Sequence, residues 1–325
     1  MKSAALSFVQ VMRELDLSEV RRQLGAPVRI LVTGSDPSTA ARLATDLFGP
    51  SGSTGWSIAV MPLDEAERGD ERPDLTLLAV GAAENPLELL ARVRRRPTQA
   101  ETPVLAILLG GPLPDGRSAD EEGPPAFALV SCPASDAAEL ARVVPPAAVE
   151  LVPDLALALG RRFAAFRPVV AERLIREASR VNGQFALLSS LPANLPLVGG
   201  AASDIADLAF LTKNQGVLVY KLAGLYGRDL EQRVTLAVEI APVVGGAFFW
   251  RTVARTLLGL LPGAVAGLPK AGVAYVGTYT VGQMARYYYS TGRRPSPELI
   301  RRFQAEGGRL AAELANRVRE WRRRQ

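Results

Sequence analysis

Short apolar runs alternate with amphipathic, alanine-rich stretches through roughly the first 150 residues of the chain. The apolar runs are rich in valine, isoleucine and leucine, and they predict strands at residues 28–32, 57–61, 75–80, 104–109 and 126–130. The stretches between or after them predict helices at residues 37–48, 86–95 and 136–143. Short, largely apolar strands separated by helices are typical of a parallel sheet that helices cover on both faces.

Strand patterns end near residue 155, and long helical patterns interrupted by proline and glycine follow. They predict helices at residues 155–166, 169–191, 197–226, 230–250 and 297–321, with two apolar segments between the last two. The fold class predicted is therefore α/β, a parallel sheet followed by an all-α helical domain. We expect an N-terminal amphipathic helix at 1–24, the α/β domain at 25–152 and the helical domain at 153–325, in keeping with the two domains that 325 residues suggest.

The composition excludes several kinds of chemistry. The chain has no histidine, which removes Ser-His-Asp and Cys-His catalysis and any zinc site that needs imidazole. Cys132 is the only cysteine, so no intrachain disulfide or thiolate cluster forms. We expect no metal site and no cofactor. Residues 1–24 are a poor signal peptide, because Ser7 and Gln10 interrupt the apolar run, so we expect a cytoplasmic protein, with the inner face of the cell membrane as a further location.

The segment after the first predicted strand has the position of a phosphate-binding loop. A Walker loop, G-x-x-x-x-G-K-[ST], uses glycine, lysine and a hydroxyl to hold phosphates and magnesium. Aligned from Gly34, those three positions hold Thr39, Ala40 and Ala41. Losing the lysine contact removes about 1.5–3 kcal/mol of phosphate binding, so we predict a degenerate P-loop. The helix start at Pro37 still attracts anions weakly, and the vestigial binding residues would be Gly34, Ser35, Ser38 and Thr39.

The other nucleotide-binding elements are also missing. The strand at 104–109 runs into "GGPLPDG", which has neither the Asn nor the Lys of the guanine-reading N-K-x-D element. The D-x-x-G element is absent unless Asp64 is its remnant, and only "SCPAS" at 131–135 is similar to the turn that flanks the base. We therefore expect no bound nucleotide and no hydrolysis. The alternative is a divergent GTP- or ATP-binding NTPase in which Arg42 or Lys213 replaces the lysine.

Two stretches resemble a known group of bacterial proteins. Residues 159–230, from "LGRRFAAFRPVV" to "LAGLYGRDL", and residues 268–296, "LPKAGVAYVGTYTVGQMARYYYSTGRRPS", are similar to the YcjF-like family. In that family an Era-like GTPase domain is joined to a C-terminal helical domain of unknown function. The resemblance implies a degenerate GTPase-like sheet and a helical domain often associated with membrane. Since the nucleotide motifs are absent, the family's GTPase activity carries over to no residue here.

The helical half carries one polar stripe and one long apolar region. Asp204, Asp207, Asn214 and Lys221 fall near one helical face, which predicts either a solvated stripe or a seam that docks the other domain. The two aspartates alone do not make a catalytic or metal site. Residues 256–285 contain a single charged residue, Lys270, but two prolines divide them into segments of about 15 residues, shorter than the roughly 20 of a membrane span. We favour a buried helical hairpin, with a re-entrant hairpin and a pair of tilted spans as alternatives.

The last predicted helix is amphipathic and basic. Ser296 is a good N-cap before Pro297. Apolar residues repeat every three, four or seven positions, which predicts a seam against another helix or a second subunit; they are Leu299, Phe303, Leu310, Leu314, Val318 and Trp321. From Arg293 onward the chain has ten arginines and four glutamates, a balance of +6, against −1 for everything before it. Such a basic end is solvated, or binds anionic lipid or, less favoured, nucleic acid.

We therefore expect a non-catalytic pseudo-GTPase scaffold or adaptor. Its helical domain would mediate self-association, partner docking or membrane-surface attachment, and a membrane-inserting hairpin at 256–285 is an alternative. We expect a protein partner or a second copy, and neither nucleic acid nor nucleotide. The residues predicted to contact the partner or a membrane combine tyrosines resembling an interfacial belt with nearby arginines; they are Tyr287, Tyr288, Arg293, Arg294, Trp321, Arg322 and Arg323.

Overall fold

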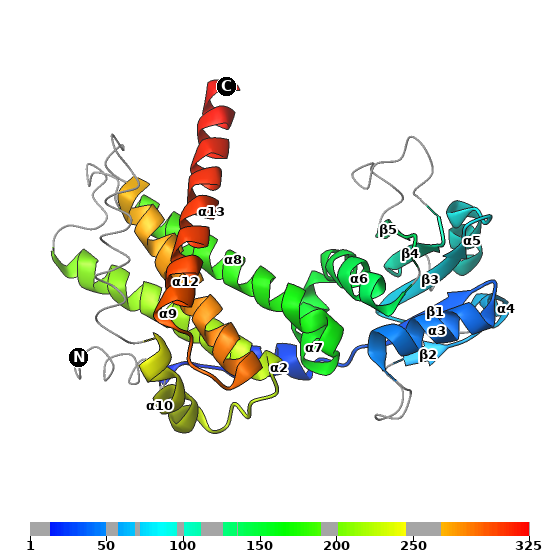
Figure 1. Cartoon of the computed structure of the whole chain (residues 1–325), viewed down its shortest axis with the longest axis horizontal. Helices are drawn as coiled ribbons and strands as arrows, with labels where there is room; N and C mark the ends of the chain where they lie inside the picture. The colour runs from blue at the N-terminus through cyan, green and yellow to red at the C-terminus, as the bar shows by residue number, and fades with distance from the viewer. Residues whose placement is uncertain are drawn as a thin grey trace. The chain divides into compact units, whose positions relative to one another are not determined.

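The computed structural model describes residues 14–49, 58–68, 72–95, 101–111, 126–134, 136–189, 201–244 and 268–324. The side chains of residues 201–209, 233–234, 242, 244, 268–269, 317–319 and 321–324 lie outside this description. The chain divides into two compact units (Figure 1). Arg22–Val170 form the α/β unit, and Met1–Arg21 together with Ala171–Gln325 form the helical unit.

The α/β unit contains a five-stranded parallel sheet with the order β2-β1-β3-β4-β5. The strands are β1 (Ile30–Gly34), β2 (Ile58–Val60), β3 (Leu75–Gly81), β4 (Val104–Leu109) and β5 (Phe127–Cys132). The predicted parallel sheet is thus confirmed. Flavodoxin-like doubly wound sheets share this order, and they bind ligands at the carboxyl ends of β1 and β3, where the winding direction reverses. The same edge is therefore the first place to look for a site.

Helices cover both faces of the sheet, as the apolar strands predict. On one face α3 (Pro37–Phe48) and α6 (Ala137–Leu151) pack together, and on the other α4 (Leu63–Arg68) packs with α5 (Pro86–Val93) (Figure 1). Leu78 and Val80 of β3 are buried with Leu89 of α5 in the core of the second face. Because successive strand side chains alternate, the buried residues between them point to the α3 side. Helix α4 was not predicted.

The α/β unit continues past the predicted boundary at residue 152 to Val170. It includes η1 (Pro153–Leu155), α7 (Ala156–Arg162) and η2 (Ala164–Phe166). The ring of Phe48 in α3 lies 4.7 Å from that of Phe163, and Phe163 lies 6.2 Å from Phe166. This aromatic group attaches the segment to the sheet unit. Helix α6 also runs eight residues past its predicted end at 143, because Val144, Ala148 and Val149 extend its buried face.

The helical unit consists of long helices, which confirms the predicted all-α half. They are α8 (Arg167–Leu188), α9 (Ala201–Leu225), α10 (Arg233–Val244), α12 (Leu268–Thr291) and α13 (Pro297–Arg324), with the first half of the short α2 (Ser18–Gly25) before them. Helix α12 packs against α9, α10 and α13 (Figure 1). A Cβ on Gly282 of α12 would lie 2.7 Å from Cγ1 of Ile175, so the backbone of α12 closely approaches α8.

Residues 268–285 of the predicted apolar hairpin lie in α12, which other helices enclose, and its side chains from Ala274 to Ala285 are buried. This supports the buried reading for that half, whereas residues 256–267 lie outside the described residues. Within the described ranges no single helix has the length and apolar character of a membrane span; only α6 together with Pro153–Arg162, bent by 112°, meets that test as a pair.

A buried polar cluster joins three helices of this unit. The amide of Asn182 in α8 donates to Oγ1 of Thr278 in α12 at 2.7 Å, and Gln215 in α9 donates to the same oxygen at 3.1 Å. Asn214 in turn donates to Oδ1 of Asn182 at 2.7 Å. Buried amides are costly unless they are paired. These bonds therefore favour one alignment of α8, α9 and α12 over slipped alternatives.

Candidate functional site

The loop after β1 is too short to wrap around a phosphate. Strand β1 ends at Gly34 and α3 begins at Pro37, so only Ser35 and Asp36 connect them. A Walker loop places four residues between its two glycines before the lysine. Gly34 also lies against the neighbouring strand, since a Cβ there would lie 2.8 Å from the carbonyl oxygen of Ala79. The chain therefore turns directly from the sheet into the helix.

The positions aligned with the Walker glycine, lysine and hydroxyl all lie inside α3. Ala40, in the lysine position, is fully buried against the sheet, so a side chain there points into the core rather than toward a ligand. Thr39 lies in the first turn and Ala41 is exposed on the outer side. The residues between β1 and α3 therefore form a two-residue connection, and the positions aligned with the Walker residues belong to the helix.

A carboxylate of the chain occupies the N-terminus of α3. Asp36 accepts hydrogen bonds from the backbone N–H groups of Ser38 at 3.1 Å and Thr39 at 3.2 Å. It also accepts from both hydroxyls, at 2.8 Å from Ser38 and 2.5 Å from Thr39. These bonds, the one from the Thr39 hydroxyl foremost, lower the pKa of Asp36 to about 2. The groups predicted to hold a vestigial phosphate are thus engaged by an internal anion, while Ser35 is exposed beside them.

Asp36 is not among the site residues predicted from the sequence, although the sequence around it has the pattern of a helix cap. Aspartate before Pro-Ser-Thr combines a strong N-cap, proline at the first helical position and two hydroxyls within reach of the cap. In place of an external anion, an N-cap carboxylate satisfies the free N–H groups of a helix start. Ser38 and Thr39, two of the four residues predicted to form a vestigial phosphate site, therefore also belong to a self-capped helix start.

The neighbouring loops at this edge are closed in the same way. After β3, Glu84 accepts from the backbone N–H of Gly81 at 2.6 Å. After β5, one oxygen of Glu139 accepts from Sγ of Cys132 at 3.2 Å and from the N–H of Ala134 at 2.7 Å. Such N–H groups would bind an anionic ligand if they were free. Glutamates of the chain bind them instead.

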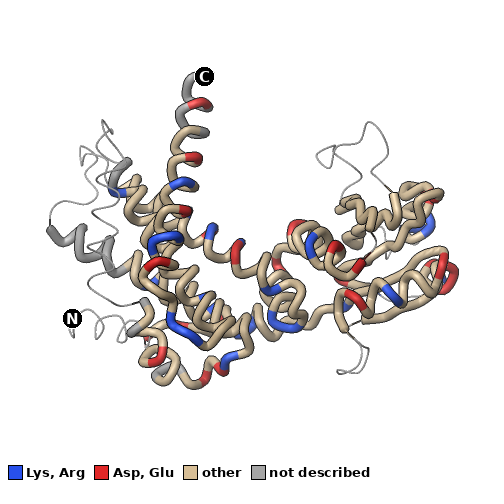
Figure 2. Tube along the Cα trace, in the orientation of Figure 1, with Lys and Arg blue, Asp and Glu red and all other residues tan. Residues whose placement is uncertain are grey.

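The carboxyl-edge loops carry one sign of charge. We define the acidic edge as the carboxylates in the described loops after the strands and in the first turns of the helices that follow; they are Asp36, Asp64, Glu65, Glu84, Glu88, Asp136 and Glu139. These same loops and first turns contain no lysine or arginine in the described part of the chain. Figure 2 shows red segments at this end of the sheet. Arg92 pairs with Asp64 at 2.6 Å and Arg142 with Glu139 at 3.5 Å, so a triphosphate approaching the edge would meet repulsion from the remaining carboxylates.

Two of the remaining nucleotide-related residues have partners within the fold. Asp64, the possible remnant of D-x-x-G, pairs with Arg92 at 2.6 Å on α4 and α5. Ser131 of the "SCPAS" turn donates to the carbonyl of Gly111 at 2.7 Å. Arg42 is exposed on α3, and Lys213 belongs to α9 of the helical unit. Among the described residues no group of histidine, cysteine, aspartate and glutamate has the arrangement of a metal site.

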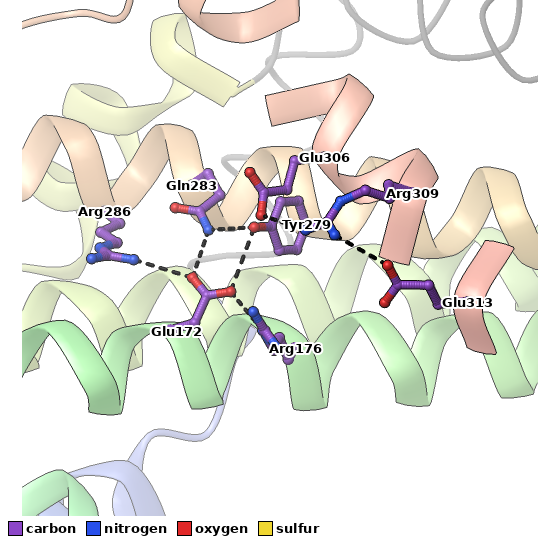
Figure 3. Close-up of polar contacts among 8 residues, drawn as sticks. All are labelled: Glu172, Arg176, Tyr279, Gln283, Arg286, Glu306, Arg309 and Glu313. Atoms are coloured by element: carbon purple, nitrogen blue, oxygen red, sulfur yellow. Dashed lines mark hydrogen bonds and ion pairs between the residues drawn. The ribbon is translucent and has the colours of Figure 1, made fainter. Parts of the chain in front are cut away.

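The helical unit holds one carboxylate among several donors (Figure 3). Glu172 of α8 accepts from Arg176 at 2.7 Å, from Gln283 of α12 at 2.8 Å and from Arg286 at 3.1 Å. Burial, then the charge of Glu172, raise the pKa of the nearby Tyr279 to about 12. Through the bonds from Gln283 and Arg286, this carboxylate links α8 to α12.

The residues predicted to contact a partner or a membrane differ in their exposure. Tyr288 donates to Glu239 of α10 at 2.8 Å and is half-buried, as is Tyr287. Arg293 and Arg294 are exposed in the turn between α12 and α13. The backbone of Trp321, Arg322 and Arg323 is helical in α13, and their side chains lie outside the described residues, as do those of Asp204 and Asp207.

Comparisons with known proteins add no relative. A scan against models of protein families found no match, and searches of curated proteins and of solved structures found none either.

Proposed function

We propose that this chain is a non-catalytic scaffold or adaptor. In this proposal the α/β unit is a degenerate, GTPase-derived module that holds no nucleotide, and the helical unit provides the contacts with a partner. One observation carries it: the carboxylate of Asp36 occupies the N–H groups and hydroxyls at the start of α3, where a phosphate would have to sit. A nucleotide would have to displace this carboxylate and enter an acidic edge.

The helical unit supports an interaction role. Glu172 of α8 pairs with Arg286 of α12 at 3.1 Å, and Arg228, in the loop after α9, pairs with Glu239 of α10. The unpaired charge of the unit instead lies outside, on the α12–α13 turn and the start of α13, where Arg293 and Arg294 are exposed. Exposed charge next to a rigid packed scaffold is suited to docking, since binding then orders few groups.

Titration calorimetry of the full chain with GTP and with ATP, each with Mg²⁺, tests the proposal. We expect no binding heat for either nucleotide at concentrations up to about 1 mM. Binding with a micromolar dissociation constant would overturn it and favour the divergent NTPase.

Two variants test whether the carboxylate of Asp36 is what prevents phosphate from binding at the start of α3. Replacing it by glycine, which is tolerated at an N-cap, frees the donors of Ser38 and Thr39, so Asp36→Gly should gain millimolar binding of inorganic phosphate. Glu88→Gln is the matched control, because Glu88 is an exposed carboxylate of the same edge with no hydrogen bond to a described backbone N–H. Equal phosphate binding by both variants would show that general charge, rather than the internal anion, closes the edge.

A further inference from the structure

The two units carry opposite net charge. The α/β unit, Arg22–Val170, has 14 lysines and arginines against 19 aspartates and glutamates, a balance of −5. The helical unit has 24 against 14, a balance of +10. The overall charge of +5 conceals this division. Such an asymmetry within one chain favours association between unlike surfaces.

The exposed positive charge of the helical unit gathers at the junction of α12 and α13. We define the basic patch as Arg293 and Arg294 of the turn with Arg301 and Arg302 of α13. All four side chains are exposed, and none of them forms an ion pair with a described residue. Between Gly292 and Phe303 the sequence offers one acidic residue, Glu298. Figure 2 shows blue segments on this part of the helical unit.

Neighbouring arginines show that this lack of pairing is local. Arg286, seven residues before the patch, binds Glu172 at 3.1 Å, and Arg228 binds Glu239. Those two arginines therefore stabilise the bundle. The four arginines of the basic patch have no such internal role, so their guanidinium groups remain available for carboxylates, which they bind in a forked, two-bond geometry.

From this complementarity we infer that the basic patch docks on the acidic edge of the α/β unit of a second copy of the chain. The proposal deepens the proposed function by naming the partner, and it rests on the acidic edge being closed to phosphate. Glu65 and Glu88 are exposed at this edge, and the pKa of Asp36 is lowered to about 2. Because two different surfaces meet, the contact is heterologous and builds chains or rings.

Light scattering coupled to size-exclusion chromatography, on the full chain, tests the inference. We expect a mass that rises as the loading increases from about 1 to about 100 µM in about 50 mM NaCl. At about 500 mM NaCl the dissociation constant should rise at least about tenfold, since salt screens exposed charges. A mass of one chain under all these conditions would overturn the inference.

Charge-reversal variants locate the contact. Arg293→Glu with Arg294→Glu should weaken association at least about tenfold at low salt. Arg180→Glu with Lys213→Glu is the matched control, because it reverses two exposed charges of the same unit away from the patch. It should associate within about twofold of the wild type. Equal weakening by both pairs would show a non-specific charge effect and contradict the inference.

A mixing experiment gives the sharpest result. Glu65→Lys with Glu88→Lys reduces the negative charge of the edge, as Arg293→Glu with Arg294→Glu reduces the positive charge of the patch, so each variant alone should associate more weakly than the wild type. An equimolar mixture should associate more strongly than either variant alone, because the unchanged patch of the edge variant fits the unchanged edge of the patch variant. No association in the mixture would overturn the inference. Binding to anionic phospholipid vesicles is the second test. If the wild-type chain remains a monomer and the arginine variant loses vesicle binding, the patch binds lipid and the inference is overturned. The nucleotide titration does not depend on self-association, so it tests the proposed function independently of this inference.

Discussion

The two units place their polar groups in opposite ways. In the α/β unit carboxylates lie at the surface, where Asp36, Glu84 and Glu139 satisfy backbone N–H groups of their own loops. In the helical unit amides and hydroxyls lie between helices, as Asn182 and Thr278 do. The first arrangement closes an edge that binds ligands in related architectures, and the second aligns helices. The contrast teaches that these polar residues stabilise loops in the α/β unit and the alignment of helices in the helical unit.

The largest effect should come from filling the closest approach in the helical unit. In Gly282→Ala the new methyl group would lie 2.7 Å from Cγ1 of Ile175 and 3.1 Å from Cδ2 of Leu218. Overpacking of this kind costs up to about 3 kcal/mol, so calorimetry should show a lower unfolding temperature. Gly25→Ala is the control, since no atom lies within 4 Å of a Cβ there. An unchanged unfolding temperature for Gly282→Ala would mean that α8 and α12 pack less closely.

Removing the shared hydroxyl should have the next largest effect. Thr278→Val leaves the amides of Asn182 and Gln215 without their acceptor, which should cost about 1–2 kcal/mol in denaturant unfolding. Thr280→Val is the matched control, because its hydroxyl bonds only the carbonyl of Val276 one turn earlier in α12. If both valine variants lost the same stability, the cluster would not be what aligns the three helices.

The acidic edge predicts a smaller, pH-dependent effect. The pKa of Asp36 is lowered from 3.8 to about 2 in the folded chain. Its ionised form therefore stabilises the fold above about pH 4, and this contribution is lost as the pH falls from about 4 to about 2. The stability difference between wild type and Asp36→Asn should shrink over that window. A constant difference down to about pH 2 would contradict the capping bonds.

The smallest effect is expected where a buried hydroxyl lacks a partner. The hydroxyl of Tyr289 is buried with no hydrogen-bond partner among the described residues, and burial raises the pKa of this phenol. Tyr289→Phe removes a polar group that the fold does not use, so stability should stay within about 0.5 kcal/mol or rise. A loss above about 1 kcal/mol in the same unfolding assay would show that a bond to this hydroxyl exists.

The sequence predicts the architecture well because periodicity reports burial. The strand at 104–109 and the helices at 37–48 and 167–188 follow from apolar runs and helical spacing, and all lie within a few residues of prediction. Helix α4 escaped prediction because six residues show too little periodicity. The end of α6 was misplaced because prolines usually end helices, whereas here buried packing carries the helix through Pro145 and Pro146.

The site was less predictable than the fold, because whether its groups are free to bind a ligand depends on hydrogen-bond geometry. The sequence shows that lysine is missing near Gly34, but not that Asp36 turns back onto Ser38 and Thr39. Pairing between distant segments is likewise invisible in the pattern. Glu172 and Arg286 form a hydrogen bond although they are 114 positions apart in the sequence. This contact distinguishes Arg286, which stabilises the bundle, from the exposed arginines of the turn.

An NMR pH titration of the Asp36 side-chain carboxyl tests the central claim most directly, because the internal hydrogen bonds act on its ionisation. We predict a pKa of about 2 in the wild-type chain and a smaller downward shift in Ser38→Ala/Thr39→Ala, which removes the hydroxyl donors and keeps the backbone N–H donors. A pKa at or above the ordinary 3.8 in the wild-type chain would contradict it, since the start of α3 would then be open to an external anion.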